Sequence, residues 1–356
     1  MLHEEEHIPV QIVAGAHDSM ILFADGRASC FGTNHFAACP RPAGDSAETP
    51  EPVELPACVT SVSLDNEGGA ALLIDGSVWV WSQDSGDELA DGDSASSVPP
   101  GVPVPISGLP PILEVAYRNQ AVFALDESGD LWWWGMFHTG GQLVHAGAPR
   151  RLDGFPKLSR VVATLAATCG ISVDGEAWCS GKNIQGSLGL PDEEVYFDPA
   201  RRIDELPQVQ DIIVDAGFGC AVAMDGSVYC WGRNHLGQLG LGTIDDEIHS
   251  ATHVEGLPPS KAIDAAWGTA CALTEMGRVF CWGGNLYGAV DGGLGMQKVP
   301  VPTELAIPGA THIAVGDGFV CALTDAQEVW CAGDPGSDGR TVSFPDYHVP
   351  GKLTLK

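Results

Sequence analysis

Residues 219–242 read GCAVAMDGSVYCWGRNHLGQLGLG, and this stretch decides how the rest of the chain is interpreted. Cys220 and Cys230 are separated by ten positions, with Asp225 midway between them and Gly226 next. Short apolar segments lie on both sides of the Asp-Gly pair. Two such segments around a three-residue loop that ends in glycine are typical of a β-hairpin, because glycine accepts the left-handed conformation that the loop needs.

The same hairpin recurs along the sequence with a period of about 50 residues, which is the signature of a repeat protein. Each unit adds a leading segment such as DIIVDAG and a closing Pro-Val segment such as PVEL, which gives four short strands. Seven units of this kind predict an all-β fold, a seven-bladed β-propeller of four-stranded antiparallel blades. The seven turns lie at residues 25–26, 75–76, 128–129, 174–175, 225–226, 276–277 and 326–327.

The two ends of the sequence look like the first and last strands of a unit. Residues 10–17 (VQIVAGAH) match an inner strand, and residues 347–356 (YHVPGKLTLK) match the outer Pro-Val strand. We expect the C-terminal strand to complete the first blade and so close the ring, since closure removes exposed strand edges. No linker interrupts the period. We therefore predict one propeller domain over residues 10–356 after a disordered tail over residues 1–9.

Two units carry a family resemblance. CALTEMGRVFCWGGN and CWGRNHLGQLGLG resemble repeats of the regulator of chromosome condensation family, and the likeness extends, more weakly, over residues 10–356. The cysteine pairs make the chain similar to a secreted, bacterial-type variant. The resemblance implies the propeller fold but no single function, because the family includes a nucleotide-exchange factor for a small GTPase, chromatin binders and a secreted β-lactamase inhibitor. Function on such a fold lies in its loops.

Four units carry a cysteine pair with the same spacing of ten. Zinc sites use closer pairs and redox sites use C-x-x-C, so neither is indicated. In a hairpin with a three-residue loop the two cysteines face each other within disulfide reach. We therefore predict four cross-strand disulfides within blades: Cys169–Cys179, Cys220–Cys230, Cys271–Cys281 and Cys321–Cys331.

Disulfides indicate an extracellular, cell-surface or periplasmic protein. The first ten residues, MLHEEEHIPV, show no signal peptide, so such a location requires that a signal has been removed. Three cysteines remain: Cys30, Cys39 and Cys58. Either a Cys30–Cys39 or a Cys39–Cys58 bridge fits, and one thiol is left over in both cases.

The formal net charge is −30, from 47 acidic and 17 basic residues. Such a charge repels the phosphate backbone, so nucleic acid is not an expected partner. No apolar run reaches membrane length. We expect a monomer that binds a protein or peptide, with a cationic one attracted by the charge. The alternative is that the charge only keeps the protein soluble.

One face of the propeller is the expected binding surface. Strands alternate in direction, so the turns between first and second strands share a face with the loops between third and fourth strands. The family's histidine position lies on this face and is occupied here by Asp18, Gly68, Gln120 or Ala121, Ala167, Phe218, Thr269 and Phe319, none of them histidine. We expect an aromatic patch that binds a partner, and the alternative is local packing of the turns. The predicted partner-binding residues are Asp18, Tyr117, Phe218, Trp267, Thr269, Phe319, Asp245, Asp246 and Glu247.

The third-to-fourth loops on this face are acidic, at residues 84–93, 191–199, 243–249 and 289–293. Solvated loops are the first interpretation. Calcium is the alternative, since it takes several oxygen ligands. Asp87, Asp91 and Asp93 form the densest cluster but lack the EF-hand spacing, so the metal ligands stay unknown.

Catalytic motifs are scarce, because no P-loop, G-x-S-x-G or HExxH sequence occurs. The histidines are scattered, among them His17, His138, His235 and His312, and His3 and His7 lie in the acidic tail. The glycines after Trp231 indicate tight turns, with Trp231 and Trp282 packed between blades. We predict a binding module without a cofactor. The alternatives are an enzyme acting at the channel mouth, such as a lyase or hydrolase, and an exchange factor for a small GTPase in a reducing cytosol.

Overall fold

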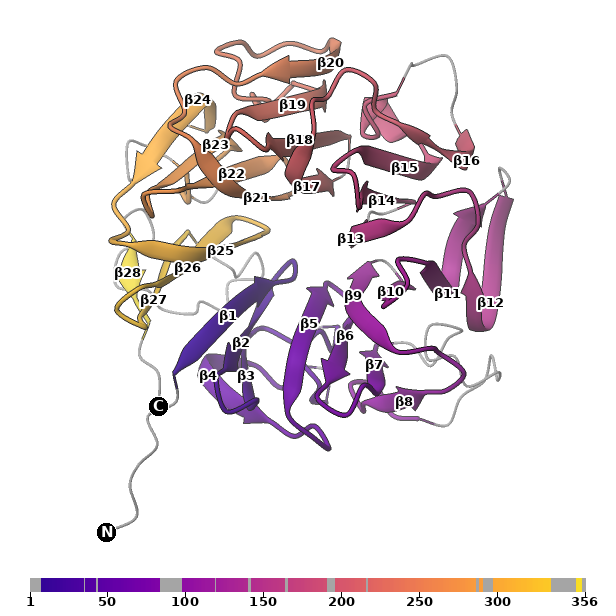
Figure 1. Ribbon diagram of the computed structural model, residues 1–356. Helices are drawn as coiled ribbons and strands as arrows, with labels where there is room; N and C mark the ends of the chain where they lie inside the picture. The colour runs from indigo at the N-terminus through magenta and orange to yellow at the C-terminus, as the bar shows by residue number, and fades with distance from the viewer. Residues whose placement is uncertain are drawn as a thin grey trace.

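A computed structural model of the chain shows seven four-stranded antiparallel sheets arranged around a central axis (Figure 1). The prediction of a seven-bladed all-β propeller is confirmed. The structure describes residues 8–34, 36–42, 44–83, 98–118, 120–139, 142–163, 166–190, 196–215, 217–285, 288–290, 297–333 and 350–353. Within these ranges the only helical segment is one short turn, Ile184–Gly186.

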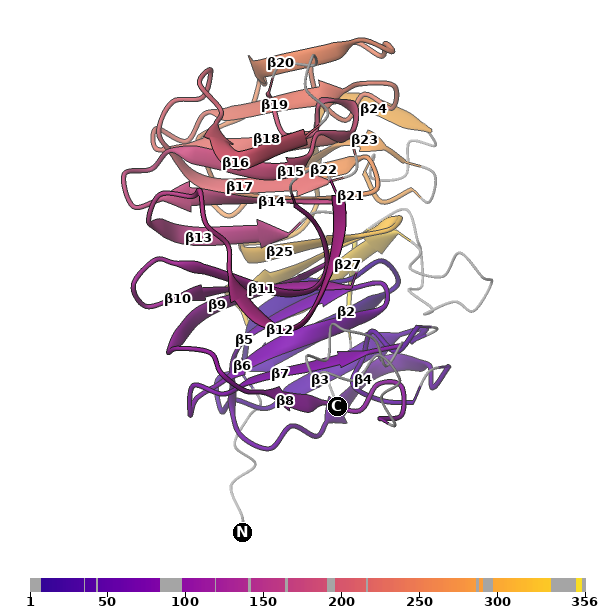
Figure 2. The same cartoon turned by 90° about the vertical axis from the view of Figure 1, so that its right-hand side faces the viewer.

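Each blade is formed by four consecutive strands, from the inner strand at the axis to the outer strand at the rim. Figure 2 shows the same blades from the side. The strands are β1 Pro9–Ala14, β2 Asp18–Phe23, β3 Ala28–Gly32, β4 Ala47–Val53; β5 Val59–Asp65, β6 Gly68–Leu73, β7 Val78–Ser82, β8 Val104–Ile106; β9 Ile112–Arg118, β10 Ala121–Asp126, β11 Leu131–Thr139, β12 Gln142–Arg151; β13 Leu158–Ala163, β14 Ala167–Ser172, β15 Ala177–Lys182, β16 Tyr196–Arg202; β17 Val209–Asp215, β18 Phe218–Ala223, β19 Val228–Arg233, β20 Ile248–His253; β21 Ser260–Ala266, β22 Thr269–Thr274, β23 Val279–Gly284, β24 Lys298–Leu305; and β25 Ala310–Gly316, β26 Phe319–Thr324, β27 Val329–Gly333, β28 Gly351–Lys352.

The hydrophobic core lies in the seams between neighbouring blades. Every residue of each second strand is buried, because these strands are covered on both sides by adjacent blades. This explains their runs of small and apolar residues, such as CAVA and CALT. The seam between the fifth and sixth blades, for example, contains Phe218, Val222, Ile263 and Trp282.

The hairpin at residues 219–242 forms as its sequence predicts. Cys220 pairs with Cys230 in the ladder, and the Ala223 N–H donates to the Ser227 carbonyl around a three-residue loop. Gly226 closes this loop with a φ of +85°. In the seventh blade Gln327 takes the equivalent left-handed conformation, with a φ of +61°.

The four predicted disulfides are confirmed, each with the two Cα atoms 4.1 Å apart. A fifth disulfide joins Cys30 to Cys39, which decides between the two alternatives left open by the sequence. Cys58 is the remaining thiol and is exposed. Its sulfur lies 3.3 Å from the Asp25 carbonyl oxygen.

A recurring hydrogen bond joins adjacent blades. A buried tryptophan on the third strand donates its indole N–H to a carbonyl in the third-to-fourth loop of the preceding blade, which confirms that Trp231 and Trp282 pack between blades. An asparagine at the start of that loop accepts the N–H of the residue five positions later and so fixes the loop. The indole bonds are Trp81 to Ala38, Trp231 to Ser187 and Trp282 to Gln238; the asparagines are Asn34, Asn183, Asn234 and Asn285.

The expected route of ring closure is wrong. The C-terminal strand β28 pairs with β27, so it completes the seventh blade and not the first. The first blade has its own outer strand, β4, because each unit already begins with an inner strand and ends with an outer one. The ring closes by side-by-side packing of β1 and β25 (Figure 1), where the Asp317 N–H donates to the Ala16 carbonyl at 2.8 Å.

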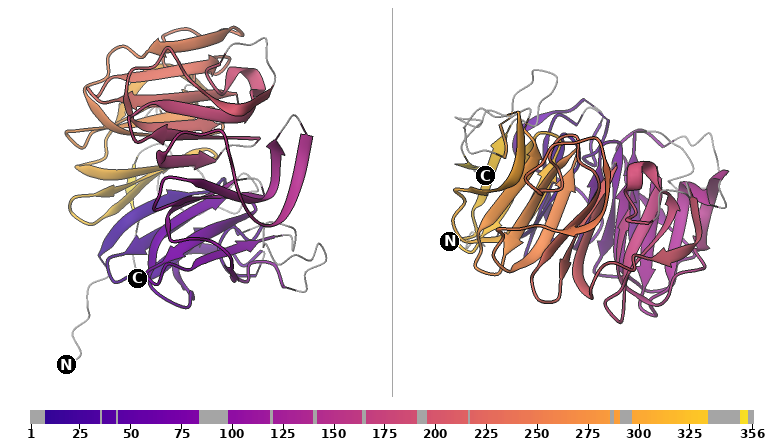
Figure 3. Two further views of the ribbon diagram at one scale, coloured as in Figure 1. Left: turned by 45° about the vertical axis from the view of Figure 1, so that its right-hand side comes forward. Right: turned by 90° about the horizontal axis from the view of Figure 1, so that it is seen from above.

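The third blade differs from the others in the length of its outer strands. β11 and β12 form a long hairpin, magenta in Figure 3, that projects from the ring. Among the described residues no helix has the length and apolar character needed to cross a membrane.

Candidate functional site

The strand order gives the propeller two distinct faces. The first-to-second turns and the third-to-fourth loops form one of them, which we call the loop face. The second-to-third hairpins and the connections between blades form the other, the hairpin face. The predicted assignment of turns and loops to one face therefore holds.

Most of the expected aromatic patch on the loop face is buried. Phe218 is 0% exposed, and the other buried members of the predicted set are Asp18, Tyr117, Thr269 and Phe319. The expectation that these side chains form a surface patch is wrong, because the family's histidine position starts the second strand, which lies between blades. Phe218, for instance, packs in the seam with the sixth blade.

Asp18 and Thr269 have structural partners instead. Asp18 Oδ1 accepts the Asn34 N–H at 2.7 Å and so helps to fix the loop after β3. Burial raises the pKa of Asp18 to about 6. The Thr269 hydroxyl donates to the Gly284 carbonyl at 2.8 Å. Neither side chain faces the solvent.

Trp267 is the exception, because it is 51% exposed. It occupies the β21–β22 turn with a φ of +50°, followed by Gly268 with a φ of +84°. A turn with two left-handed central residues favours Asn-Gly, and a bulky side chain there is strained. The corresponding positions of other blades hold Asn66, Asn119 and Asp317.

The β19–β20 loop lies next to this turn. A Cβ atom added at Gly268 would lie 2.6 Å from Leu236 Cδ1 of that loop, and Lys298 Nζ donates to the His235 carbonyl. The loop thus borders the half-exposed Trp267.

Asp245 organises this loop. Its two carboxylate oxygens accept hydrogen bonds from the side chains of His249 and Thr243 at 2.8 and 2.9 Å. The hydrogen bond from His249 is the main cause that lowers the pKa of Asp245 to about 2. Asp246 and Glu247 are exposed, so they are the acidic groups that the loop offers to a partner. The acidic segments 84–93, 191–195 and 291–293, and with them Asp87, Asp91 and Asp93, lie outside the described residues.

A set of charged side chains surrounds the axis and was not predicted from the sequence. Four charged side chains line the central channel, one from the inner strand of each of the third to sixth blades. They are Glu114, Arg160, Asp211 and Asp264. Arg160 Nη1 pairs with Asp211 Oδ1 at 2.9 Å. The sequence gives a weak indication of this set, because each member is a charged residue next to apolar ones in its inner strand, as in ILEVAY and KAIDAA.

Main-chain N–H groups hold these carboxylates in place. Each accepts a hydrogen bond from the inner strand of the next blade: Glu114 from Val161, Asp211 from Ile263 and Asp264 from Val315. Burial raises the pKa of Glu114 and Asp211, and it raises that of Asp264 to about 7.

Arg118 ties three blades together at the loop-face end of the channel. Its guanidinium lies 2.5 Å from Asp215 Oδ1 and 3.6 Å from Asp65 Oδ1. The channel volume is about 400 Å³. Burial raises the pKa of the neighbouring Asp317.

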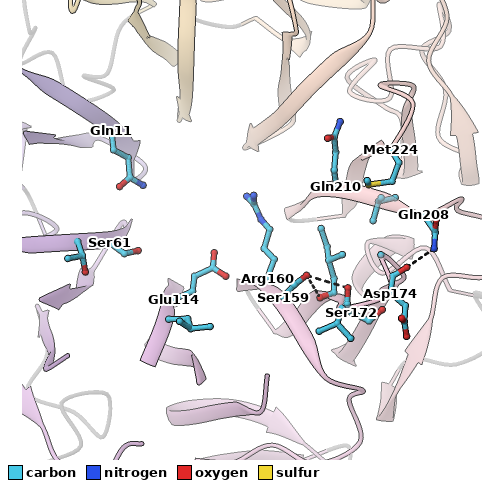
Figure 4. A pocket seen from close by; sticks show the side chains of 16 residues that line it. Gln11, Ser61, Glu114, Ser159, Arg160, Ser172, Asp174, Gln208, Gln210 and Met224 are labelled. Atoms are coloured by element: carbon cyan, nitrogen blue, oxygen red, sulfur yellow. Dashed lines mark hydrogen bonds between the residues drawn. The ribbon is translucent and has the colours of Figure 1, made fainter. Parts of the chain in front are cut away.

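The channel widens on the hairpin face into a pocket of about 950 Å³ (Figure 4). Inner strands β5, β9, β13 and β17 and the hairpins of the fourth and fifth blades line it. Figure 4 shows Glu114 and Arg160 projecting into this pocket. Among the described residues, no three His, Cys, Asp or Glu side chains group as metal ligands would.

Two models of one repeat family match the chain. The regulator of chromosome condensation (RCC1) repeat matches residues 225–273, and a second model of this repeat matches residues 261–289. Residues 225–289 are therefore similar to RCC1 repeats, within a seven-bladed propeller. The matched residues run from the β18–β19 hairpin of the fifth blade to residue 289, after β23 of the sixth blade.

Curated proteins that are similar to the chain include large and small ones. Human E3 ubiquitin-protein ligase HERC2 is 27% identical over 354 residues, which are 93% of this chain and 7% of the ligase. The mitochondrial RCC1 domain-containing protein RUG3 of Arabidopsis thaliana is 28% identical over 288 residues, which are 74% of this chain and 63% of RUG3. The chain therefore spans only part of the length of these relatives. The human regulator of chromosome condensation is 28% identical over 303 residues, 77% of this chain and 72% of that protein.

Solved structures share the fold. Prp20p from Saccharomyces cerevisiae, described with binding properties to Gsp1p and histones, superposes with a TM-score of 0.79 at 18% identity, over 98% of this chain and 87% of that one. Human WBSCR16 superposes with a TM-score of 0.76 at 18% identity, over 92% of this chain and 95% of that one.

Proposed function

We propose that this RCC1-repeat propeller is an extracytoplasmic, single-domain binding module whose loop face contacts a protein or peptide. Trp267 carries the proposal. A half-exposed tryptophan in a left-handed turn costs about 1–3 kcal/mol in backbone strain, which is retained where function requires it. Tryptophan is also a frequent anchor of protein interfaces.

The surroundings of Trp267 support a protein partner. The β19–β20 loop beside it is fixed by Asp245, so it needs little ordering on binding. Asp246 and Glu247 leave carboxylates at its surface, and the net charge of −30 attracts basic proteins over a longer range. A basic partner is therefore favoured.

The disulfides support a location outside the cytoplasm. Five disulfides persist in an oxidising compartment, whereas cytosolic reductants oppose them. We place the protein outside the cytoplasm on this ground.

The test compares capture of a partner by three forms of the protein. Wild type, Trp267→Ala and Met276→Ala are immobilised and exposed to the extracellular proteome of the source organism. Met276 is a matched control because it is an exposed apolar side chain on the opposite face. We expect a protein that wild type and Met276→Ala retain and that Trp267→Ala binds at least about tenfold more weakly.

Purified histones, named for Prp20p, give a defined basic probe for the same three forms. Binding that falls with salt and depends on Trp267 supports the proposal. If Trp267→Ala and Met276→Ala retain the partner equally in both assays, the proposal that the binding site lies on the loop face is contradicted.

A further inference from the structure

The pocket on the hairpin face is a second concave site, on the side of the ring opposite Trp267. Its volume of about 950 Å³ lies in the range of ligand sites in proteins. Below it the channel continues along the inner strands to Arg118 at the loop-face end. The pocket and channel together can take a side chain that enters from the hairpin face.

The pocket and the channel contain more acidic than basic side chains. Glu114 lines the pocket, and Asp211 and Asp264 line the channel below it, whereas Arg160 is the basic side chain among them. Arg160 is already paired with Asp211 at 2.9 Å. Arg118, at the far end, is paired with Asp215. Among the described residues neither Glu114 nor Asp264 forms a direct ion pair, and the arginines act on them only at longer range.

The carboxylates are held in position before any ligand binds. One oxygen of Glu114 accepts the Val161 N–H at 2.9 Å, and one oxygen of Asp264 accepts the Val315 N–H at 2.8 Å. These bonds fix the side chains and favour their charged forms, against the burial that raises the pKa of both groups. A cation that enters the channel meets preorganised acceptors, so little side-chain entropy is lost on binding.

Three exposed apolar side chains stand among the polar residues that line the pocket. Leu113, Val173 and Met224 line it, and each is more than half exposed. Val173 and Met224 follow the second strands of adjacent blades at equivalent positions, where Ile74 is also exposed. Exposed apolar side chains around a concave site mark an interaction surface.

We infer that the hairpin-face pocket binds a peptide segment that presents a lysine or arginine flanked by apolar residues. The basic side chain enters the channel between the inner strands toward Glu114 and Asp264. The flanking residues cover Leu113, Val173 and Met224. Charge complementarity selects this occupant, because an acidic or neutral side chain would leave the channel carboxylates without a counterion.

The experiment measures binding of the folded protein to an array of capped peptides with one varied central residue. Lysine, arginine, norleucine and glutamate occupy the centre, and the flanks are either leucine and valine or serine and glycine. Norleucine keeps the apolar stem of lysine and removes the charge. We expect the strongest binding for a basic centre with apolar flanks.

Three variants locate the binding. Glu114→Gln keeps an oxygen for the Val161 N–H, and Asp264→Asn keeps one of the two oxygens that accept main-chain N–H groups. Both variants remove the charge, so each should weaken basic-centre peptides at least about tenfold. Met224→Ser should reduce the preference for apolar flanks. Matched controls are Glu255→Gln, an exposed carboxylate outside the pocket, and Val301→Ser, an exposed valine on the outer strand β24.

The outcomes separate this site from the loop face. Trp267→Ala should leave the array profile unchanged, so loss of either site does not imply loss of the other. No preference for a basic centre in wild type overturns the inference. So does a preference that persists in folded Glu114→Gln and Asp264→Asn, with folding checked by their melting curves. Equal binding of serine-flanked and leucine-flanked lysine peptides overturns the role of Leu113, Val173 and Met224.

Discussion

Single side chains at the axis determine how the inner strands are joined. Asp264 accepts N–H groups from Val315 of the next blade and from Ala265 of its own strand. These bonds favour the charged carboxylate, but burial disfavours it more strongly and raises the pKa of Asp264 to about 7. The folded protein therefore holds a proton on this group at pH values where the unfolded chain has lost it.

Asp264→Asn should flatten the dependence of stability on pH. The pKa of Asp264 rises from 3.8 in the unfolded chain to about 7 in the fold, so its contribution is present below pH 3.8 and is lost as the pH rises to about 7. The loss amounts to at most roughly 4 kcal/mol. The charged groups around it, Asp211, Arg160 and Arg118, remain in the variant.

Urea midpoints measured at about pH 5, 6.5 and 8 for both proteins check this, because the lower two values fall within the window and the highest lies above it. The wild-type midpoint should fall more steeply with pH than that of the variant. Parallel curves would show that Asp264 is not the titrating group.

The sequence could not distinguish buried from exposed aromatic residues at this scale. Phe218 and Trp267 both lie near first-to-second turns, yet only Trp267 reaches the solvent. Burial of Phe218 depends on side chains of the sixth blade, such as Ile263, about 50 residues away, which a local pattern does not report.

At the scale of elements, the hairpin was predictable and the seam was not. The hairpin follows from symmetric cysteine spacing around a loop that ends in Gly226, which is local information. The bond from Trp231 to the Ser187 carbonyl joins residues 44 positions apart, and it depends on how Asn183 shapes the loop of the preceding blade. Spacing alone predicted that Trp231 packs between blades but not its partner.

Trp231→Phe should destabilise the seam between the fourth and fifth blades. The change leaves the buried Ser187 carbonyl without its donor and removes apolar volume, at a cost of roughly 2–3 kcal/mol. Trp330→Phe is the control, because the Trp330 indole donates to the side chain of Glu328 at 2.9 Å and is only partly buried. A urea midpoint for Trp231→Phe no lower than that for Trp330→Phe would contradict the role of this bond.

At the scale of the whole molecule, the repeat period predicts the number of blades, and the structure determines how they meet. The channel charges and the hairpin-face pocket arise only when side chains from several blades converge, so a single unit shows Glu114 or Asp264 as a charged residue in an inner strand but not that the two share one channel. The expected closure by β28 was wrong because the ring needs no shared blade when β1 packs directly on β25.

The state of the cysteines is informative about both the scaffold and the compartment of the protein. Ten of them form five disulfides within blades, and only Cys58 is left as an exposed thiol. Disulfides of this kind are consistent with an oxidising environment.

Counting thiols in protein purified from its native source, unfolded without reductant, tests this account most directly. We expect one reactive thiol per chain, at Cys58, and eleven after reduction. Eleven reactive thiols before reduction would show that the blades are not stapled, and would contradict both the disulfide scaffold and the location outside the cytoplasm.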